Sequence, residues 1–519
     1  MNHLLTIAEV IAAQARLQPA KIGARDSQRS LTFAHWDERA SRLANALLDL
    51  GLAPGDRVAL LAYNCVEWME FYVALARAGL AAVPINFRLV SSEIEYIVTH
   101  CEARAFIVQD DLIERVNPIR DRLGIAPGAF VHFGKPSAPS GWQSYETLLG
   151  RASPAPPAVS VRPEDTLALM YTSGTTGRPK GAIRNHAGSA LMSLVTALDM
   201  GFARDDTALL VMPMCHANSL NFSFTFVYLG ATCVIDDRKH FDPEHLLQTL
   251  SEQKVTFTSL VPTHYMMILG LPDAVKRNYD VDRISKLMIS SAPARRDTKL
   301  AIMEHFRNTQ LFELYGSTEA GWVTILRPHE QLTKLGTVGR EWTGSGAIRL
   351  LDPEGNEVPD GAVGELYSRT PYVFDGYWKD PDKSAEAFRG AWCSVGDMAR
   401  RDEDGFYELV DRKSNMIISG GENIYPSEVE ELLATHPSVK DVAVIGMPHD
   451  KWGEAVHAVV VLHTGATAGE AELLEWCKER IAGYKRPRKI AFMAEADLPR
   501  TATGKIQHRV LRARLIEGS

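Results

Sequence analysis

The chain has little cysteine, no long hydrophobic run and no excess of positive charge. Its six cysteines, among 519 residues, show no C-x-x-C spacing and suit reduced thiols in a cytosol. No apolar run is long enough to span a bilayer, and the N-terminal segment reaches Glu9 before a signal-peptide core is complete. A net charge of −8 argues against a nucleic-acid partner. The sequence therefore predicts a cytoplasmic protein without integral membrane association.

The length and the apolar pattern predict several α/β layers. A chain of 519 residues is too long for one core, and its 45% hydrophobic and 23% charged residues are ordinary for a globular protein. The first part alternates a helix between Thr32 and Gly51, a strand over 57–61, a helix over 67–78 and a strand over 81–85. A second alternating block covers residues 167–326. Such alternation predicts parallel sheets covered by helices.

The rest of the chain has a different character. Residues 335–412 contain short strand patterns separated by turn signals, which predict a small β-barrel or bent sheet. The segment after Arg412 suits a separate α+β domain. We therefore expect an N-terminal domain over 1–412, with α/β subdomains over 1–334 and a β-rich subdomain over 335–412. A mobile C-terminal α+β domain is expected over 413–519.

The most informative segment is a loop rich in glycine and hydroxyl residues, over 171–181, which follows an apolar run. Glycines let a backbone approach a ligand closely, and successive N–H groups in such a turn form an anion-binding concavity. The loop cannot be a Walker phosphate loop, because Pro179 precedes Lys180 and Gly181 follows it. The residues expected to wrap a polyphosphate are Thr172, Ser173, Gly174, Thr175, Thr176, Gly177 and Lys180.

Four further motifs follow this loop in order. Each alone would be read as a turn with a capping Asp or a solvated Lys. They are Tyr315-Gly-Ser-Thr-Glu319, Ser394-Val-Gly-Asp397, Val410-Asp-Arg412 and Pro499-Arg-Thr-Ala-Thr-Gly-Lys505. Together with the loop they closely resemble the adenylate-forming superfamily of acyl-CoA synthetases, adenylation domains and luciferases. The resemblance covers essentially the whole chain.

The resemblance implies that the chain activates a carboxylic acid with ATP. It gives Lys505 the task of bridging the acid and the phosphate, and makes Glu319 a Mg²⁺ ligand together with Thr175. His216 and Thr318 complete the catalytic residues that it implies. Asp397 would grip the ribose hydroxyls. The ATP- and AMP-binding residues implied outside the phosphate loop are Ser291, Ala292, Pro293, Glu313, Tyr315, Gly316, Thr318, Asp397 and Arg412.

The same resemblance places an acyl pocket after two of the motifs. Its implied residues are His216, Asn218, Asn221, Phe222, Gly316, Gly321 and Trp322. No Asp or Glu occurs between Met212 and Ile235, so nothing there would pair the ammonium group of an amino acid. Trp322 has two open interpretations. Pointing inward, it favours an aromatic or medium-length acid; alternatively, it packs into the core behind the motif.

Only fourteen residues follow Lys505, which leaves no room for a fused carrier domain, so the expected acceptor is a diffusible molecule or a separate carrier protein. Residues 416–426 and 449–454 resemble the family's coenzyme A-facing segments, and this resemblance makes coenzyme A the expected acceptor. The residues implied to contact it are Arg88, Ser419, Gly420, Gly421 and Trp452, and the implied hinge is Ser414, where relatives commonly carry Asp or Lys. We expect a Mg²⁺-dependent acyl-CoA ligase that uses ATP and coenzyme A, and a homodimer is compatible with the sequence. The alternatives are an enzyme that loads a separate acyl carrier protein and an inactive acyl- or nucleotide-binding regulator.

Overall fold

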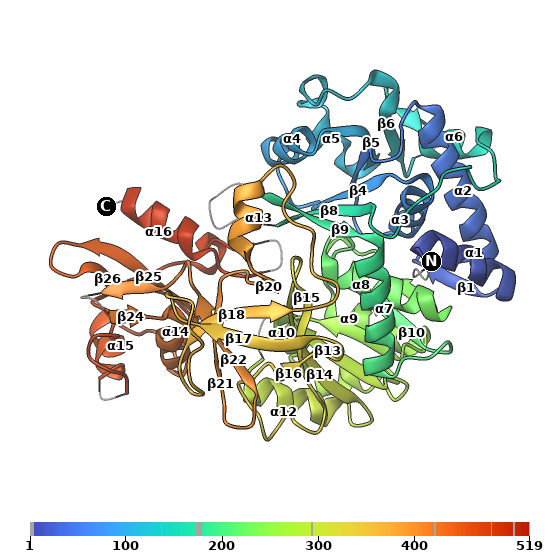
Figure 1. Cartoon of the computed structure of the whole chain (residues 1–519). Helices are drawn as coiled ribbons and strands as arrows, with labels where there is room; N and C mark the ends of the chain where they lie inside the picture. The colour runs from blue at the N-terminus through green and yellow to red at the C-terminus, as the bar shows by residue number, and fades with distance from the viewer. Residues whose placement is uncertain are drawn as a thin grey trace. The chain divides into compact units, whose positions relative to one another are not determined.

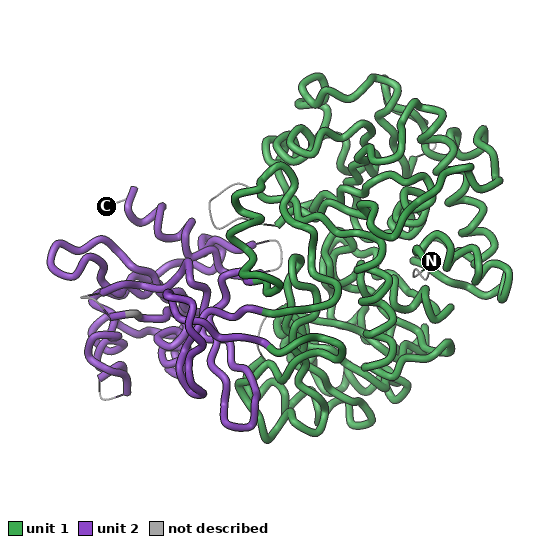
Figure 2. Tube along the Cα trace, in the orientation of Figure 1, with its two compact units in different colours: residues 1–347, 368–393 green, residues 348–367, 394–519 purple. Residues whose placement is uncertain are grey.

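The computed structural model describes residues 5–135, 137–172, 179–291, 294–419, 422–478, 480–501 and 504–517. Contacts between residues divide the chain into two compact units, which Figure 2 shows in different colours. Unit 1 comprises Met1–Ala347 and Ser368–Cys393, and unit 2 comprises Ile348–Tyr367 and Ser394–Ser519. The boundary predicted between residues 412 and 413 stays a prediction, because compactness alone does not identify a pivot.

The first sheet of unit 1 has seven strands, and its central strands are parallel and buried on both faces, as parallel sheets require. β8 and β9 pair antiparallel at one edge, and residues 173–178 between them lie outside the described part of the chain. In spatial order the strands are β7 (Gln143–Ser144), β6 (Phe130–Phe133), β5 (Ala103–Gln109), β3 (Arg57–Leu61), β4 (Ala81–Ile85), β8 (Thr166–Thr172) and β9 (Lys180–Asn185).

The local signals around this sheet are confirmed. Helix α2 (Phe33–Asp49) begins after Thr32, whose hydroxyl accepts the N–H of His35. Helix α3 (Glu67–Ala78) has its predicted bounds and ends at Gly79, whose φ of 66° is left-handed. The strands over 57–61 and 81–85 are also found with the predicted bounds.

The second sheet of unit 1 has nine strands, of which six neighbouring strands are parallel. Their carboxyl ends lie at one edge, which is where open α/β sheets bind ligands. In spatial order the strands are β16 (Arg340–Glu341), β15 (Gly321–Leu326), β14 (Gln310–Ser317), β13 (Lys286–Ser290), β12 (Phe257–Leu260), β10 (Thr207–Leu210), β11 (Thr232–Ile235), β1 (Ile22–Arg25) and β2 (Ser30–Thr32).

Two helices beside this sheet are central to the site. Helix α7 (His186–Met200) follows β9, and helix α8 (Ala217–Leu229) follows β10. They lie side by side in the middle of unit 1 (Figure 1). Nine of the thirteen residues of α8 are buried, so this helix is a core element. Its first turn therefore presents side chains from a fixed backbone.

Unit 2 combines short strands with an α+β part. β21 (Asp397–Arg401) and β22 (Tyr407–Arg412) form an antiparallel pair, and β18 (Gly364–Arg369) joins β21 at Gly364 and Glu365. A five-stranded sheet follows, covered by α14 (Pro426–Ala434), α15 (Glu470–Trp476) and α16 (His508–Glu517). Its strands are β24 (Glu422–Ile424), β23 (Ile417–Ser419), β26 (Gly453–Leu462), β25 (Val439–His449) and β27 (Lys489–Phe492).

All six cysteines are buried and reduced. Burial raises the pKa of each of these thiols, to about 12 for Cys101, Cys215 and Cys393. Among the described residues, no helix is both long and apolar enough to cross a membrane.

Candidate active site

In unit 1 the predicted residues gather at the carboxyl ends of strands. Thr172 is the last residue of β8, Ser291 directly follows β13, and Tyr315 lies near the end of β14. His216 lies in the loop after β10, immediately before α8. Ser173, Gly174, Thr175, Thr176, Gly177, Ala292 and Pro293 lie outside the described residues.

The Glu319 carboxylate is the focus of the nucleotide side. It is 6% exposed, and its Oε1 accepts the Thr172 hydroxyl at 3.2 Å and the Tyr377 hydroxyl at 2.9 Å. Its Oε2 has no hydrogen-bond partner among the residues that the structure describes. Lys180 lies over the Tyr377 ring, 4.3 Å from its centroid. Tyr377 therefore contacts two of the predicted residues, Glu319 and Lys180, and it was missed by the sequence reasoning.

This arrangement fits a Mg²⁺ ion. Mg²⁺ is bound in such sites by one or two carboxylates, together with substrate phosphates and water. The open Oε2 of Glu319 supplies one carboxylate oxygen, and the Thr172 hydroxyl lies beside it. In the described parts of the chain there is no cluster of three or more His, Cys, Asp or Glu side chains that could hold a metal ion. A magnesium ion here would therefore depend on phosphate oxygens for much of its coordination.

The backbone of Glu319 is held by a tight hairpin between β14 and β15. A Cβ on Gly316 would lie 2.3 Å from the carbonyl oxygen of Gly321, so only glycine permits this approach. The Ser317 hydroxyl accepts the N–H of Ala320 at 2.9 Å across the turn. Arg184 donates to the carbonyl oxygens of Thr318 at 3.3 Å and Glu319 at 3.4 Å. These contacts hold the hairpin backbone from which the Glu319 side chain projects.

Arg184 supports this hairpin from inside unit 1. Burial lowers the pKa of Arg184 to about 10, while Asp375 and Glu319 act in the opposite direction. Its side chain was missed by the sequence reasoning, because a single Arg inside a strand pattern carries no spacing signal.

Glu313 lies on β14, two residues before Tyr315. It forms a buried ion pair with Lys299 of α12 (Arg296–His305), and its Oε1 accepts the N–H of Ala294 at 3.3 Å. Burial raises the pKa of Glu313, and Lys299 opposes this shift. The Glu313 carboxylate thereby holds the backbone of Ala294, which follows the predicted Ser291–Pro293 segment in sequence.

His216 opens the acid side of the site. It is the N-terminal cap residue of α8, and its carbonyl accepts the N–H of Leu220. Its buried Nε2 has no hydrogen-bond partner among the described residues. Burial and the nearby Arg88 lower the pKa of His216 to about 4. The imidazole is therefore neutral at pH 7, with one ring nitrogen free for a ligand.

Asn218 is the second residue of α8 and reaches the ends of two strands. Its amide nitrogen donates to the hydroxyls of Ser259 and Ser290, each at 3.1 Å, and these hydroxyls are 3.1 Å apart. No partner of the Asn218 carbonyl oxygen occurs among the described residues. Asn221, one turn later, is buried.

Phe222 and Trp322 form an aromatic wall. Their ring centroids are 5.5 Å apart, and Phe222 also packs on Phe257 at 4.7 Å. Trp322 is 5% exposed and donates its indole N–H to the Thr196 hydroxyl at 3.0 Å. The indole is thus anchored in the core, as one of the two interpretations expected. Whether its face also borders the acid stays a prediction.

In unit 2 three residues predicted for the site, Asp397, Arg412 and Lys505, lie close together. Arg412 Nε is 2.5 Å from a carboxylate oxygen of Asp397, its partner across β21 and β22. Lys505 keeps an exposed surface, yet crowding by neighbouring atoms lowers the pKa of its ammonium group. Arg412 lowers this pKa further, and Asp397 opposes the shift. The three predicted residues therefore share one electrostatic environment.

The residues expected at coenzyme A and at the hinge are partly described. Ser419 pairs with Gly453, and Gly420 and Gly421 lie outside the described residues. Trp452 stacks on His449 at 4.4 Å, with the Arg488 guanidinium 4.5 Å from its ring centroid.

Two other residues expected near coenzyme A or the hinge are exposed. Arg88 of unit 1 lies over the ring of Phe87, 4.7 Å from its centroid. Ser414 of unit 2 lies in an exposed turn.

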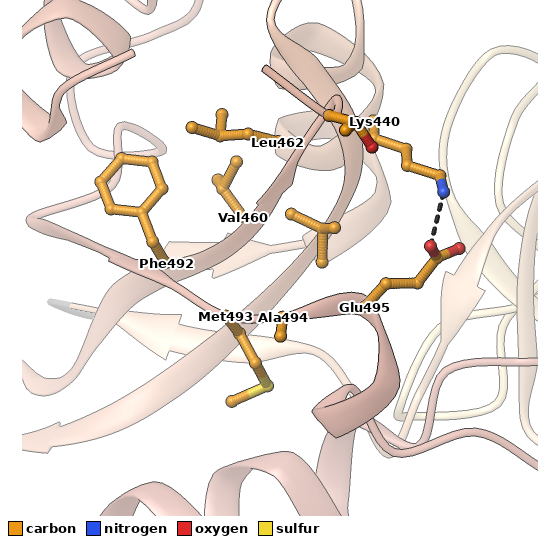
Figure 3. A pocket seen from close by; sticks show the side chains of 9 residues that line it. Lys440, Val460, Leu462, Phe492, Met493, Ala494 and Glu495 are labelled. Atoms are coloured by element: carbon orange, nitrogen blue, oxygen red, sulfur yellow. Dashed lines mark hydrogen bonds and ion pairs between the residues drawn. The ribbon is translucent and has the colours of Figure 1, made fainter. Parts of the chain in front are cut away.

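A separate hollow of about 460 Å³ lies on the sheet of unit 2 (Figure 3). Apolar side chains of β26 and β27, among them Val460 and Phe492, line it, and the ion pair between Lys440 and Glu495 closes one side. It contains none of the predicted site residues and is not part of the candidate active site.

Comparisons with known proteins agree with this geometry. Residues 11–378 match the model of the AMP-binding enzyme family, and residues 428–505 match that of the AMP-binding enzyme C-terminal domain. An indoleacetate–CoA ligase of Aromatoleum aromaticum is 35% identical over 97% of this chain and 97% of its own length. A feruloyl-CoA synthase of an Amycolatopsis species is 35% identical over 96% of this chain and 97% of its own. An anthranilate CoA ligase, solved in complex with anthranoyl-AMP, aligns with a TM-score of 0.89 at 28% identity, over 100% of this chain and 99% of that one.

Proposed function

Because the chain belongs to the AMP-binding enzyme family and is an acyl-CoA synthetase that uses ATP, Mg²⁺ and coenzyme A, we propose that it acts through an acyl-AMP on an aromatic, phenylpropenoid or medium-chain carboxylic acid. The family expected from the motifs is thereby confirmed. The observation that carries the proposed intermediate is the grouping of Lys505 with Asp397 and Arg412 in unit 2.

In the first half-reaction, an oxygen of the acid attacks the α-phosphorus of ATP. The bond between the α-phosphorus and the bridging oxygen breaks, and pyrophosphate leaves. Both reactants are anions, and two unit charges at 4 Å cost about 4 kcal/mol at an effective dielectric near 20. Lys505 supplies the positive charge between them, while Asp397 accepts the ribose hydroxyls.

Glu319 orients the nucleotide phosphates for this step. Bound Mg²⁺ would neutralise phosphate charge, and Glu319 and Thr172 are the described residues placed to hold it. The hydrogen bond from Tyr377 keeps Oε1 of Glu319 occupied and leaves Oε2 directed away from it. The Arg184 contacts hold the hairpin backbone that carries this carboxylate.

In the second half-reaction, the thiol of coenzyme A attacks the acyl carbon, and AMP leaves with the bonding electron pair. The neutral His216 leaves the carboxylate end of the acid free of a permanent ion pair. Its unpartnered Nε2 is available to hydrogen-bond the acyl group. Trp452, held between His449 and Arg488, is the described residue that we assign to the coenzyme A side.

The acid side suits a ring. Phe222 and Trp322 supply flat apolar surface, which favours offset stacking of an aromatic acid. The carbonyl oxygen of Asn218 is an acceptor with no described partner, so it favours acids that carry a ring N–H or hydroxyl. The two relatives, named for indoleacetate and for ferulate-type substrates, support this class of acid.

A panel of acids tests the proposal. Aromatic acids with and without a ring donor, straight-chain acids of increasing length and dicarboxylic acids would be assayed for AMP and pyrophosphate release, with and without coenzyme A. We expect the fastest coenzyme A-dependent AMP formation with donor-bearing aromatic acids. Pyrophosphate released in the absence of coenzyme A, together with isolated acyl-AMP, would support the intermediate. Transfer to an acyl carrier protein but not to coenzyme A, or no pyrophosphate with any acid, would contradict the proposal.

A further inference from the structure

The turn that carries Lys505 is held by hydrogen bonds from Arg500 and Thr501. Thr501 donates its N–H to the Lys505 carbonyl at 2.7 Å, and its hydroxyl accepts the Lys505 N–H at 3.1 Å. Arg500 donates to the Gly504 carbonyl at 2.8 Å and forms an ion pair with Asp441 of β25. These contacts close the turn, and the chain after it pairs back on the chain before it, with the Gln507 N–H donating to the Pro499 carbonyl at 2.8 Å.

The chain leaves the turn through a second anchor. His508, three residues after Lys505, is the first residue of α16, and its Nε2 lies 2.6 Å from Oε1 of Glu430. Glu430 belongs to α14, and the same oxygen accepts the N–H of Val444 of β25 at 2.7 Å. Both side chains are largely buried, with 17% and 21% exposure for His508 and Glu430. The pair therefore ties the start of α16 to a helix and a strand of unit 2.

We propose that His508 and Glu430 are positioning residues, which fix the start of α16 and thereby hold Lys505 where it can reach the nucleotide. This inference rests on the proposed role of Lys505. Three residues span roughly 10 Å even when fully extended, so an anchor at His508 limits how far Lys505 can move. Neither His508 nor Glu430 would touch the substrate.

The electrostatics of unit 2 agree with a charged pair. Burial disfavours the imidazolium, but the hydrogen bond to Glu430 and the negative charges of Glu430 and Asp411 outweigh it and raise the pKa of His508. The titratable groups that act on the imidazole are thus Glu430 on α14 and Asp411 on β22. Because the pKa is raised, the pair is charged at lower pH and loses its charge as the pH rises through the folded-state pKa.

The test compares the two half-reactions in the full-length enzyme. His508→Ala should lower acyl-AMP formation about tenfold or more, mainly in kcat, and leave thioester formation from added acyl-AMP within about twofold of wild type. His508→Lys keeps a cation opposite Glu430 and should restore most of the adenylation rate. In wild type the adenylation rate should fall as the pH rises and His508 loses its proton. This fall should be absent in His508→Lys. Glu430→Gln keeps the side-chain shape and provides a second route to the same loss.

Arg514→Ala is the matched control, because Arg514 lies on the same helix and donates to the Asp497 carbonyl at 3.1 Å. It should leave both half-reactions unchanged. Wild-type adenylation in His508→Ala and Glu430→Gln would overturn the inference, as would equal losses in both half-reactions. A parallel Lys505→Ala variant separates the two proposals. If Lys505→Ala adenylates normally, the proposed function of Lys505 fails. If Lys505→Ala loses adenylation but the His508 and Glu430 variants adenylate normally, only the positioning role fails.

Discussion

The Tyr377 hydroxyl donates a hydrogen bond to Oε1 of Glu319 at 2.9 Å, and the Thr172 hydroxyl donates to the same oxygen at 3.2 Å. With two donors on one oxygen, the carboxylate cannot rotate freely, and its other oxygen stays available. Tyr377 lies nearly sixty positions after Glu319 in the chain, and the Lys180 ammonium group lies over its ring. One phenol thereby organises both the carboxylate and the cation of the nucleotide side.

Replacing this phenol should weaken metal use. Tyr377→Phe removes the hydrogen bond to Glu319 and should raise the Mg²⁺ concentration needed for half-maximal adenylation several-fold, with a stability cost of about 1–3 kcal/mol. Mg²⁺ titrations of pyrophosphate release would measure the first effect, and thermal unfolding the second. Tyr372→Phe is the control, since Tyr372 donates instead to the Trp322 carbonyl at 3.0 Å. An unchanged Mg²⁺ dependence in Tyr377→Phe would contradict the role given to the phenol.

Lys505 should serve only one half-reaction. Lys505→Ala removes an electrostatic stabiliser and should lower acyl-AMP formation about a hundredfold or more. Thioester formation from added acyl-AMP should be largely spared. Rapid-quench measurements of each half-reaction would check this, and equal losses in both would refute the assignment.

Trp322 should influence which acid is used. Trp322→Phe shortens the aromatic wall and loses the bond to Thr196, so bulkier or longer acids should gain relative to small aromatic ones. The KM for ATP should stay nearly unchanged. Trp342→Phe makes a similar volume change in a buried neighbour whose ring centroid is 6.2 Å away. If both variants only lose stability and keep the wild-type acid profile, Trp322 is a core residue alone.

Ser414 tests the predicted hinge. Ser414→Pro fixes φ in the exposed turn and should hold one orientation of the C-terminal part. Adenylation and thioester formation would then be affected very unequally, whereas Ser414→Ala should behave as wild type. Wild-type rates of both half-reactions in the proline variant would place the pivot elsewhere.

The protein should lose stability in mild acid through His186. This imidazole is 3% exposed, and neither ring nitrogen has a described hydrogen-bond partner. Burial lowers the pKa of His186 to about 4. A depressed pKa gives stability that is complete above the ordinary value near 6.5 and is lost as the pH falls toward 4. The loss is at most about 3 kcal/mol at the low end.

His186→Phe removes this titration and should flatten the fall of Tm between pH 6.5 and 4. His35→Gln, at an exposed histidine, should leave the fall of Tm unchanged. An equally steep fall in His186→Phe would show that other groups control the acid sensitivity.

The sequence predicted what local patterns control. The strand over 57–61, the helix over 67–78 and the strand over 81–85 depend on apolar runs and on the glycine that ends the helix, and each is found at those bounds. The order of the motifs likewise indicated the family. These signals act over a few residues, or are carried by residue types that the chemistry demands.

The supporting contacts were not predictable, because they join distant segments. Tyr377 meets Glu319, Lys299 meets Glu313, and His508 meets Glu430 across 78 positions. No periodicity links such partners, since they become neighbours only through the packing of sheets and helices. The sequence also left open whether Trp322 borders the acid or packs in the core, because both positions favour a large aromatic side chain.

The burial of every cysteine has a practical consequence at the bench. A thiol reacts with electrophiles and disulfides as its thiolate, and burial keeps these six protonated as well as shielded. Coenzyme A is itself a thiol, so its consumption can be followed with colorimetric disulfide reagents. The native enzyme should add no background to that signal, and oxidised coenzyme A should not become attached to it as a mixed disulfide. Reagent uptake by the protein would then report unfolding rather than turnover.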